Sequence, residues 1–212
     1  MQDYPLNIHK LLEYSEQNNA SEEIVSKRLE GDVHRYTYKD LGRRSRQLAS
    51  ALKKAGVEPG DVAGTIAWNG YRHVELYFAL PGIGALYHTI NPRLTDEQLA
   101  YVINHADDTM VFIEASFVER LEAIGSSLKS IKMIVVLCDE ADLPSSENLP
   151  LVSYEAFIAT GDPAYQWQEF DEKTACAICY TSGTTGNPKG VVYSHRALIL
   201  QAFSFIIGAE LT

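Results

Sequence analysis

The sequence predicts an α/β fold in which βαβ units build a mostly parallel sheet flanked by helices. Candidate strands begin near Val62, Leu86, Thr109 and Met133, at intervals of 23 or 24 residues. Each interval contains a helical pattern of apolar residues, at residues 71–80, 95–104 and 116–128. Strand–helix alternation at this spacing is typical of right-handed crossovers between parallel strands.

Composition limits the classes of protein that the chain can represent. With 212 residues, 46% of them hydrophobic, the chain can bury a sizeable core. Its net charge of −10 disfavours nucleic acid as a partner, so any anion site must be local. The sequence contains neither an apolar run near the roughly 18 residues of a membrane helix nor an export signal. The 3 cysteines suit a reducing compartment, and we expect a cytoplasmic protein.

The chain divides into four segments. Residues 1–59 form an N-terminal helix and strand segment, 60–138 the βαβ core, 139–170 a connecting segment, and 171–212 a loop hairpin with its following helix. In the first segment we expect a short helix, a hairpin between residues 23–27 and 33–36, and a longer helix. Thr37 and Asp40 form a capping box for that longer helix, and Gly56 follows its end. Its basic side chains are expected on the solvated side: Arg43, Arg44, Arg46, Lys53 and Lys54.

Other local patterns complete the expected elements. Thr95 and Gln98 form a second capping box. Pro81 is expected to end or kink the helix that precedes it, at residues 71–80. Residues 139–150 are acidic and contain two prolines, as in an exposed connection. Ser153 is expected to cap a short helix, and Ser194 a helix that runs towards residue 207.

The stretch from Tyr180 to Gly190 has the composition of a phosphate-binding loop. Glycine lets backbone N–H groups approach an anion closely, hydroxyl groups add donors, and Lys189 adds a positive charge. Both flanks have strand patterns, at residues 175–179 and 191–193, so the loop joins strand to strand. A Walker-type P-loop instead opens directly into a helix, so that template does not match. A plain surface turn is the alternative interpretation of the glycines.

Four other features have a structural and a functional interpretation. Cys176 and Cys179 form a CxxC, but in a strand they are better explained as buried structural thiols than as a redox or zinc site. His88 is better explained as a hydrogen-bonded structural histidine. For His195, contact with the nucleotide or acyl site and a purely structural role are equally good interpretations. Trp68-Asn69 is explained by packing, with the lining of an acyl pocket as the alternative.

The loop sequence resembles the phosphate-loop motif of the adenylate-forming acyl-CoA synthetases. The resemblance covers nearly the whole chain and is most similar to the branch that activates medium- and long-chain fatty acids. Further matching motifs are Trp68-Asn69, Tyr77-Phe78-Ala79, Pro81-Gly82, Asn91-Pro92-Arg93-Leu94 and Ser194-His195-Arg196. The resemblance implies the N-terminal part of that family's large domain, and ATP, Mg²⁺, coenzyme A and a fatty acid as ligands.

The resemblance also implies roles for particular residues. Lys189 is the expected catalytic residue, because it would hold the phosphates as pyrophosphate leaves. Thr181 would help to hold Mg²⁺. The expected nucleotide-binding residues are Thr181, Ser182, Gly183, Thr184, Thr185, Gly186, Lys189 and Gly190.

Three alternative functions are left open by the residues. The first is another acyl-adenylate enzyme, such as an aryl-acid CoA ligase or a ligase that acylates a carrier protein. The second is a P-loop NTPase, and the third is a non-catalytic nucleotide-binding or interaction domain. Members of the family are much longer than this chain, and their adenine, ribose and C-terminal lysine motifs follow the phosphate loop. We therefore expect the chain alone to be inactive, with exposed apolar faces and self-association, for example as a homodimer.

Overall fold

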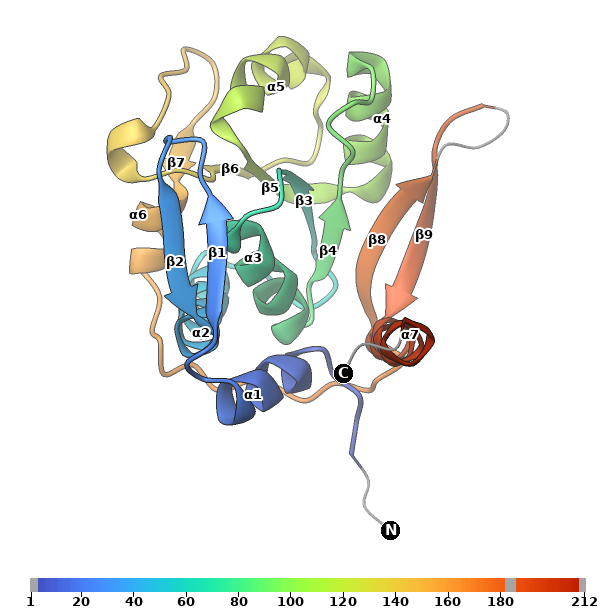
Figure 1. Cartoon of the computed structure of the whole chain (residues 1–212). Coiled ribbons are helices and arrows are strands. Elements are labelled where there is room, and N and C mark those ends of the chain that lie inside the picture. Colours follow the sequence, from blue (N-terminus) through green and yellow to red (C-terminus); the bar gives the residue numbers. More distant parts are fainter. Residues whose placement is uncertain (1–3, 182–185, 210–212) are drawn as a thin grey trace.

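A seven-stranded sheet organises the computed structural model, which describes residues 4–181 and 186–209. The strand order is β7-β6-β5-β3-β4-β8-β9, and every neighbouring pair is parallel except β8 and β9 (Figure 1). This confirms the predicted mostly parallel α/β fold. The strand bounds are β3 Val62–Ile66, β4 Leu86–Thr89, β5 Asp108–Ile113, β6 Met133–Val136, β7 Leu151–Ser153, β8 Ala175–Thr181 and β9 Lys189–Ser194.

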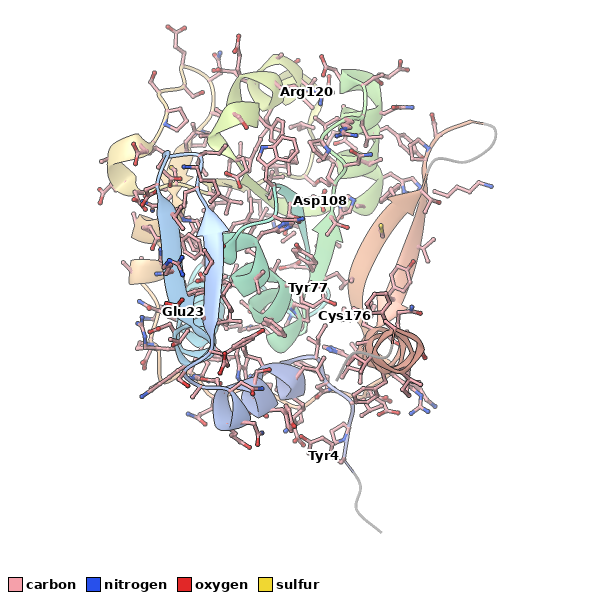
Figure 2. All side chains as sticks on the ribbon, viewed as in Figure 1. Tyr4, Glu23, Tyr77, Asp108, Arg120 and Cys176 are labelled. Carbon is pink, nitrogen blue, oxygen red and sulfur yellow. The ribbon has the colours of Figure 1, made fainter. Side chains whose placement is uncertain are left out.

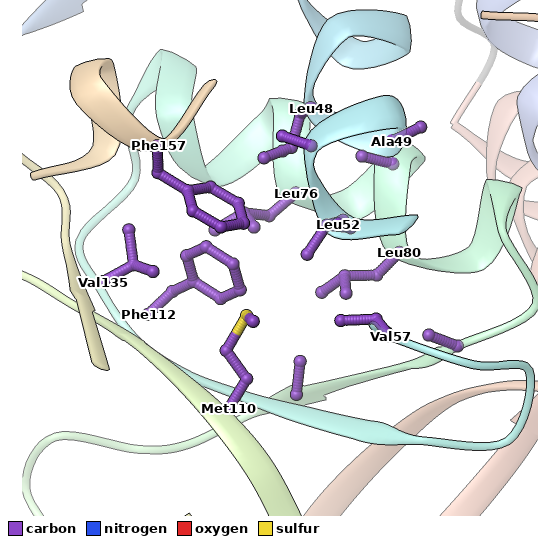
Figure 3. Packing of buried hydrophobic residues seen from close by; sticks show 14 of the residues in the cluster. Leu48, Ala49, Leu52, Val57, Leu76, Leu80, Met110, Phe112, Val135 and Phe157 are labelled. Atoms are coloured by element: carbon purple, nitrogen blue, oxygen red, sulfur yellow. The ribbon is translucent and has the colours of Figure 1, made fainter. Parts of the chain in front are cut away.

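Helices cover both faces of the sheet, and the side chains of β5 point alternately into the two cores that lie on these faces. Its residues Met110 and Phe112 face the core beneath α2 (Tyr38–Lys54), α3 (Tyr71–Gly82) and α6 (Tyr154–Ala159), as Figure 3 shows. Val111 and Ile113 face the core beneath α4 (Asp96–Ala106) and α5 (Val118–Ile124). This alternation along one strand places apolar side chains on both sides of a sheet that is buried between helices.

The predicted helix boundaries follow from their capping residues. Both capping boxes are formed: Thr37 with Asp40 at the start of α2, and Thr95 with Gln98 at the start of α4. Ser194 accepts a hydrogen bond from the backbone N–H of Ala197 and so caps α7 (His195–Gly208). Side-chain acceptors satisfy N–H groups that have no partner within the helix, which fixes where the helix begins.

The N-terminal segment packs beside the sheet and contacts the chain just before β8. It contains α1 (His9–Asn18) and a separate antiparallel hairpin of β1 (Glu23–Lys27) and β2 (Val33–Thr37). The Asn7 side chain donates to the carbonyl of Phe170 at 3.0 Å and accepts from its N–H at 2.9 Å. The backbone N–H of Ile8 donates to Nδ1 of His195 at 3.3 Å. These contacts join residues more than 150 positions apart, which the sequence pattern did not predict.

The structure differs from the expected elements at α5 and β7, and it agrees with them near Pro81. The helix expected at residues 116–128 is interrupted: α5 is flanked by the 3₁₀ turns η1 (Ala115–Phe117) and η2 (Gly125–Ser127). The helix expected to end or kink near Pro81 ends one residue later, at Gly82. Strand β7 was not predicted, because its 3 residues are too few to show a periodic pattern.

Arg44 and Arg46 were wrongly assigned to the solvated side of α2. Arg44 binds Glu75 of α3, with Nε 2.7 Å from the carboxylate, and also contacts Glu155 at 3.1 Å. Arg46 forms a two-pronged ion pair with Glu16 of α1, with both distances 2.7 Å. The stems of long basic side chains can pack along apolar surface while their charged ends meet carboxylates, so helical position alone does not predict exposure.

Two fully buried histidines make the fold sensitive to acid. Burial lowers the pKa values of His9 and His195 from 6.5 to about 4. For His9, nearby Lys10 lowers the pKa further and Glu169 opposes this. Because the folded pKa values lie below the unfolded value, their contribution to stability is present above pH 6.5 and is lost as pH falls towards 4.

We expect the free energy of unfolding to fall by about 1 to 2 kcal/mol per histidine between pH 7 and pH 5. Urea titrations at the two pH values measure this change. His9→Phe keeps a ring against Trp167, 5.6 Å away in the parent, but cannot take up a proton. This variant should therefore lose less stability over the same interval. An equal loss in parent and variant would assign the acid sensitivity to other groups.

Candidate functional site

Two candidate residues flank the loop of the β8–β9 hairpin, one on each strand. Thr181 ends β8 and Lys189 begins β9, and the two are paired across the antiparallel ladder. Both side chains are exposed. Because β8 runs parallel to β4, the loop leaves the sheet at its carboxyl edge, where ligand sites of open α/β sheets lie.

The structure places some of the candidate residues and leaves others undescribed. Ser182, Gly183, Thr184 and Thr185 lie outside the described residues. Gly186 has φ +86°, a left-handed conformation that favours glycine, and no described residue other than its chain neighbours lies within 4 Å of the position that a Cβ atom would take. The remaining candidates Lys189 and Gly190 belong to β9.

The hairpin geometry is inconsistent with a P-loop NTPase. Lys189 begins a strand, whereas in a Walker-type loop the lysine begins a helix whose N-terminus faces the phosphates. The next helix, α7, begins at His195, and the N–H of His195 donates to the carbonyl of Thr174 just before β8. Helix α7 therefore starts at the opposite end of the hairpin from the loop.

His195 lies far from the loop, which argues against contact with phosphates held there. Strand β8 is 7 residues long, so His195 lies roughly 20 Å from the loop. The imidazole is fully buried and stacks on Phe170, with ring centroids 6.1 Å apart. In this structure His195 is a packing residue.

The CxxC cysteines form no disulfide, and Cys176 lies in an environment that disfavours the thiolate. All three cysteines are free, and burial raises the pKa of Cys176 to about 12. Figure 2 labels Cys176 near the start of β8. Cys179 is only half-buried, so the expectation of two buried thiols holds for Cys176 alone. A thiol with a raised pKa is a poor nucleophile, which agrees with a structural role.

Tyr180 brings together groups that the sequence did not connect. Its hydroxyl lies 2.6 Å from Nδ1 of His105, at the end of α4. Its ring lies 5.0 Å from the ring of His88, which is hydrogen-bonded to both carboxylate oxygens of Asp108 at 2.9 and 3.0 Å. Asp108 lies in the interior of the fold (Figure 2), and its burial raises its pKa. His88 is thus buried and hydrogen-bonded, as its structural interpretation expects.

A cavity of about 300 Å³ opens at the carboxyl ends of β3 and β5. The helices after these strands, α3 and α5, pack on opposite faces, so this is the topological switch point of the sheet. Trp68 and Asn69 line the cavity, together with Arg72 and Glu114. Burial raises the pKa of Glu114 to about 7, and Arg72 opposes this only in part. Sequence analysis missed Glu114, although its position directly after a predicted strand was the available signal.

Carboxylates and guanidinium groups form an ion-pair network beside this cavity. In the described part of the chain, Glu30, Asp139 and Asp142 are the group of carboxylates close enough to share a cation. Arg72 binds Glu30 at 2.7 Å and Asp139 at 2.5 Å, and Arg28 also binds Asp139. Within the described residues the arginines pair with Glu30 and Asp139, so two of the three carboxylates already have a basic partner.

The doubly wound sheet and the loop that joins β8 to β9 agree with the protein family identified by sequence comparison. The model of the AMP-binding enzyme family matches residues 12–211, and the chain belongs to that family. None of the described helices combines the length and apolar character needed to span a bilayer.

Relatives within this class are CoA ligases. A medium-chain-fatty-acid–CoA ligase of Ectopseudomonas oleovorans is 44% identical over 94% of this chain, which spans 36% of that protein. A 3-methylmercaptopropionyl-CoA ligase of Ruegeria lacuscaerulensis is 42% identical over 96% of this chain and 38% of its own length. A solved long-chain-fatty-acid-CoA ligase from Archaeoglobus fulgidus is 18% identical and matches the whole chain, and 41% of its own, with a TM-score of 0.83. The chain thus spans well under half the length of these proteins.

Proposed function

We propose that the whole protein activates a medium- or long-chain fatty acid as its CoA thioester. The carboxylate attacks the α-phosphorus of ATP, pyrophosphate leaves, and an acyl-adenylate forms. The thiol of coenzyme A then attacks the acyl carbonyl and displaces AMP. The observation that carries this proposal is the hairpin that presents Thr181 and Lys189 at the carboxyl edge of the sheet, in a chain of the AMP-binding family.

The chemistry of the first step suits the residues of the hairpin. Adenylation needs positioned reactants and neutralised phosphate charge, and it needs no protein nucleophile. Lys189 supplies a positive charge that opposes the charge developing on the departing pyrophosphate. Its exposed position leaves the ammonium group accessible to a nucleotide.

Mg²⁺ would be held by a hydroxyl group together with the phosphate oxygens of the nucleotide. Thr181 offers such a hydroxyl next to Lys189. Mg²⁺ prefers oxygen ligands and is commonly bound by few protein groups plus substrate phosphates, so the residue type fits. The ion would neutralise phosphate charge when bound.

A panel of acids tests the substrate class in the whole protein. Fatty acids of medium and long chain, 3-methylmercaptopropionate and benzoate are supplied with ATP, Mg²⁺ and coenzyme A, and the thioesters are identified by mass. We expect kcat/KM for the best fatty acid to exceed that for either other acid by about tenfold or more, because each buried methylene contributes about 0.8 kcal/mol. A preference for 3-methylmercaptopropionate or benzoate would assign the protein to those ligases instead.

The same assay tests the acceptor and the contribution of the rest of the protein. If an acyl-adenylate forms but its acyl group passes only to a carrier protein, then the carrier protein replaces coenzyme A as the proposed acceptor. We propose that the 212-residue chain alone makes no thioester, because it spans 36% of the length of a CoA-ligase relative. Turnover by the chain alone would show that the required groups lie within it.

A further inference from the structure

Tyr180 and Gly190 form a cross-strand pair directly beneath the phosphate loop. The two residues face each other in the antiparallel ladder, next to the Thr181–Lys189 pair. A Cβ atom on Gly190 would lie 3.0 Å from Cζ, 3.2 Å from Cε2 and 3.3 Å from the hydroxyl oxygen of Tyr180. The Tyr180 ring therefore covers the position where a side chain of residue 190 would begin.

The backbone gives no separate reason for glycine at position 190. Gly190 lies in β9 and its φ is outside the left-handed region, unlike Gly186 at +86°. Glycine inside a strand normally weakens the strand, and an aromatic ring packed over it compensates. Here the Tyr180 ring occupies the space beside Gly190, which accounts for the small residue at that position in the strand.

The Tyr180 ring is itself held from two sides. His105 of α4 binds its hydroxyl at 2.6 Å, and the two rings meet edge to face with centroids 5.8 Å apart. The ring of His88 lies 5.0 Å away and is fixed by the buried Asp108. The ring thus connects β9 to the exposed His105 of α4 and to the buried His88 of β4.

This arrangement bears on Thr181 and Lys189. Neighbouring residues of a strand point to opposite faces, so Tyr180 supports the hairpin from the face opposite Thr181 and Lys189. A shift of the ring would shift the adjacent pair that closes the loop. A Cβ atom on residue 190 would require the ring to move by a few tenths of an ångström. Displacements of about 1 Å in a reactive arrangement reduce rates by up to about 100-fold, so this smaller shift is expected to cost about tenfold or less.

We propose that Tyr180 is a positioning residue for the phosphate loop, held by His105, and that Gly190 is glycine in order to accommodate its ring. This proposal rests on the proposed adenylation only for its effect on rate. It reassigns Gly190 from contact with phosphate to support of the hairpin, while Lys189 and Thr181 keep their proposed contacts with ATP and Mg²⁺.

A double-mutant cycle separates the two roles of Gly190. In the whole protein, Gly190→Ala should lower kcat for acyl-adenylate formation about tenfold and leave KM for the fatty acid unchanged. In a Tyr180→Ala background the same substitution should cost less than about twofold, because the ring is gone. If Gly190→Ala still costs about tenfold there, the glycine serves the phosphate and the proposal is overturned.

The hydroxyl contact is tested by a second cycle. Tyr180→Phe and His105→Ala should each lower kcat about fivefold, and the double variant should be no slower than either. Tyr193→Ala removes a ring from the same hairpin, farther from the loop, and should leave kcat within about twofold. Additive losses of kcat in the double variant, or an equal loss of kcat in Tyr193→Ala, would show that Tyr180 contributes only general packing and does not position the loop.

Hydrogen exchange keeps this test independent of activity. In the 212-residue chain, Tyr180→Phe should raise the exchange rates of the amides of residues 189 and 190 about fivefold, and those of β5 should not change. If the whole protein forms no acyl-adenylate and these amides still respond, the proposed function fails while the support of the hairpin stands. Unchanged exchange in Tyr180→Phe would contradict the inference itself.

Discussion

Lys189→Ala should slow acyl-adenylate formation by the whole protein by about 100-fold or more. Loss of one positioned charge that stabilises a developing anion costs on the order of 3 kcal/mol. The KM for the fatty acid should stay within about twofold, because Lys189 acts on the phosphates of ATP and not on the acyl chain. Release of pyrophosphate, followed with parent and variant at saturating fatty acid, measures the effect.

Two further substitutions define the origin of the Lys189 effect. Lys173 is an exposed lysine shortly before β8, and Lys173→Ala should leave the rate within about twofold. Lys189→Arg retains the charge but changes its shape and reach, so it should recover only part of the activity. Equal rates in Lys189→Ala and the parent would remove Lys189 from the mechanism.

Arg44→Met should destabilise the fold by about 3 to 5 kcal/mol. Glu75 is fully buried, and Arg44 binds it together with the hydroxyl of Tyr154, at 2.7 and 2.6 Å respectively. Removing one partner of a buried ion pair leaves the other charge buried without compensation, which strongly lowers the free energy of unfolding. Urea unfolding of the 212-residue chain measures the change.

Controls and pH test the cause of that loss. Arg43 lies on the same helix but is exposed, so Arg43→Met should cost less than about 0.5 kcal/mol. Burial raises the pKa of Glu75, and loss of Arg44 would raise it further. The folded state then binds the proton more tightly, so the Arg44→Met penalty should shrink as pH falls from 8 to 5. A penalty independent of pH would point to lost packing and not to the unpaired carboxylate.

The regular elements could be predicted because short-range rules determine them. Spacing of apolar runs located β3, β4, β5 and β6, and the capping residues Thr37 and Thr95 located the starts of α2 and α4. Contacts between distant residues were not predicted. The burial of Arg44 depends on Glu75 and Glu155, which lie 31 and 111 positions away. Nothing in the local pattern around Arg44 contains that information.

The candidate site was only partly accessible from the sequence. The composition of the loop located Thr181 and Lys189, because hydroxyl groups and a lysine among glycines suit phosphate. It did not distinguish the glycines: Gly186 has a positive φ, whereas a Cβ atom on Gly190 would lie 3.0 Å from the Tyr180 ring. The cavity beside Glu114 depends on strand order, which appears only when the sheet is assembled.

The fate of the fatty acid oxygens tests the central claim, adenylation by attack of a carboxylate on the α-phosphorus of ATP, most directly. A fatty acid labelled with ¹⁸O in its carboxylate is supplied to the whole protein with ATP, Mg²⁺ and coenzyme A. Attack forms a bond from a carboxylate oxygen to phosphorus, and the thiol then breaks the bond from that oxygen to the acyl carbon. Each AMP released should therefore carry one labelled oxygen, and pyrophosphate should carry none. Label in inorganic phosphate together with ADP, or AMP without label, would contradict the account.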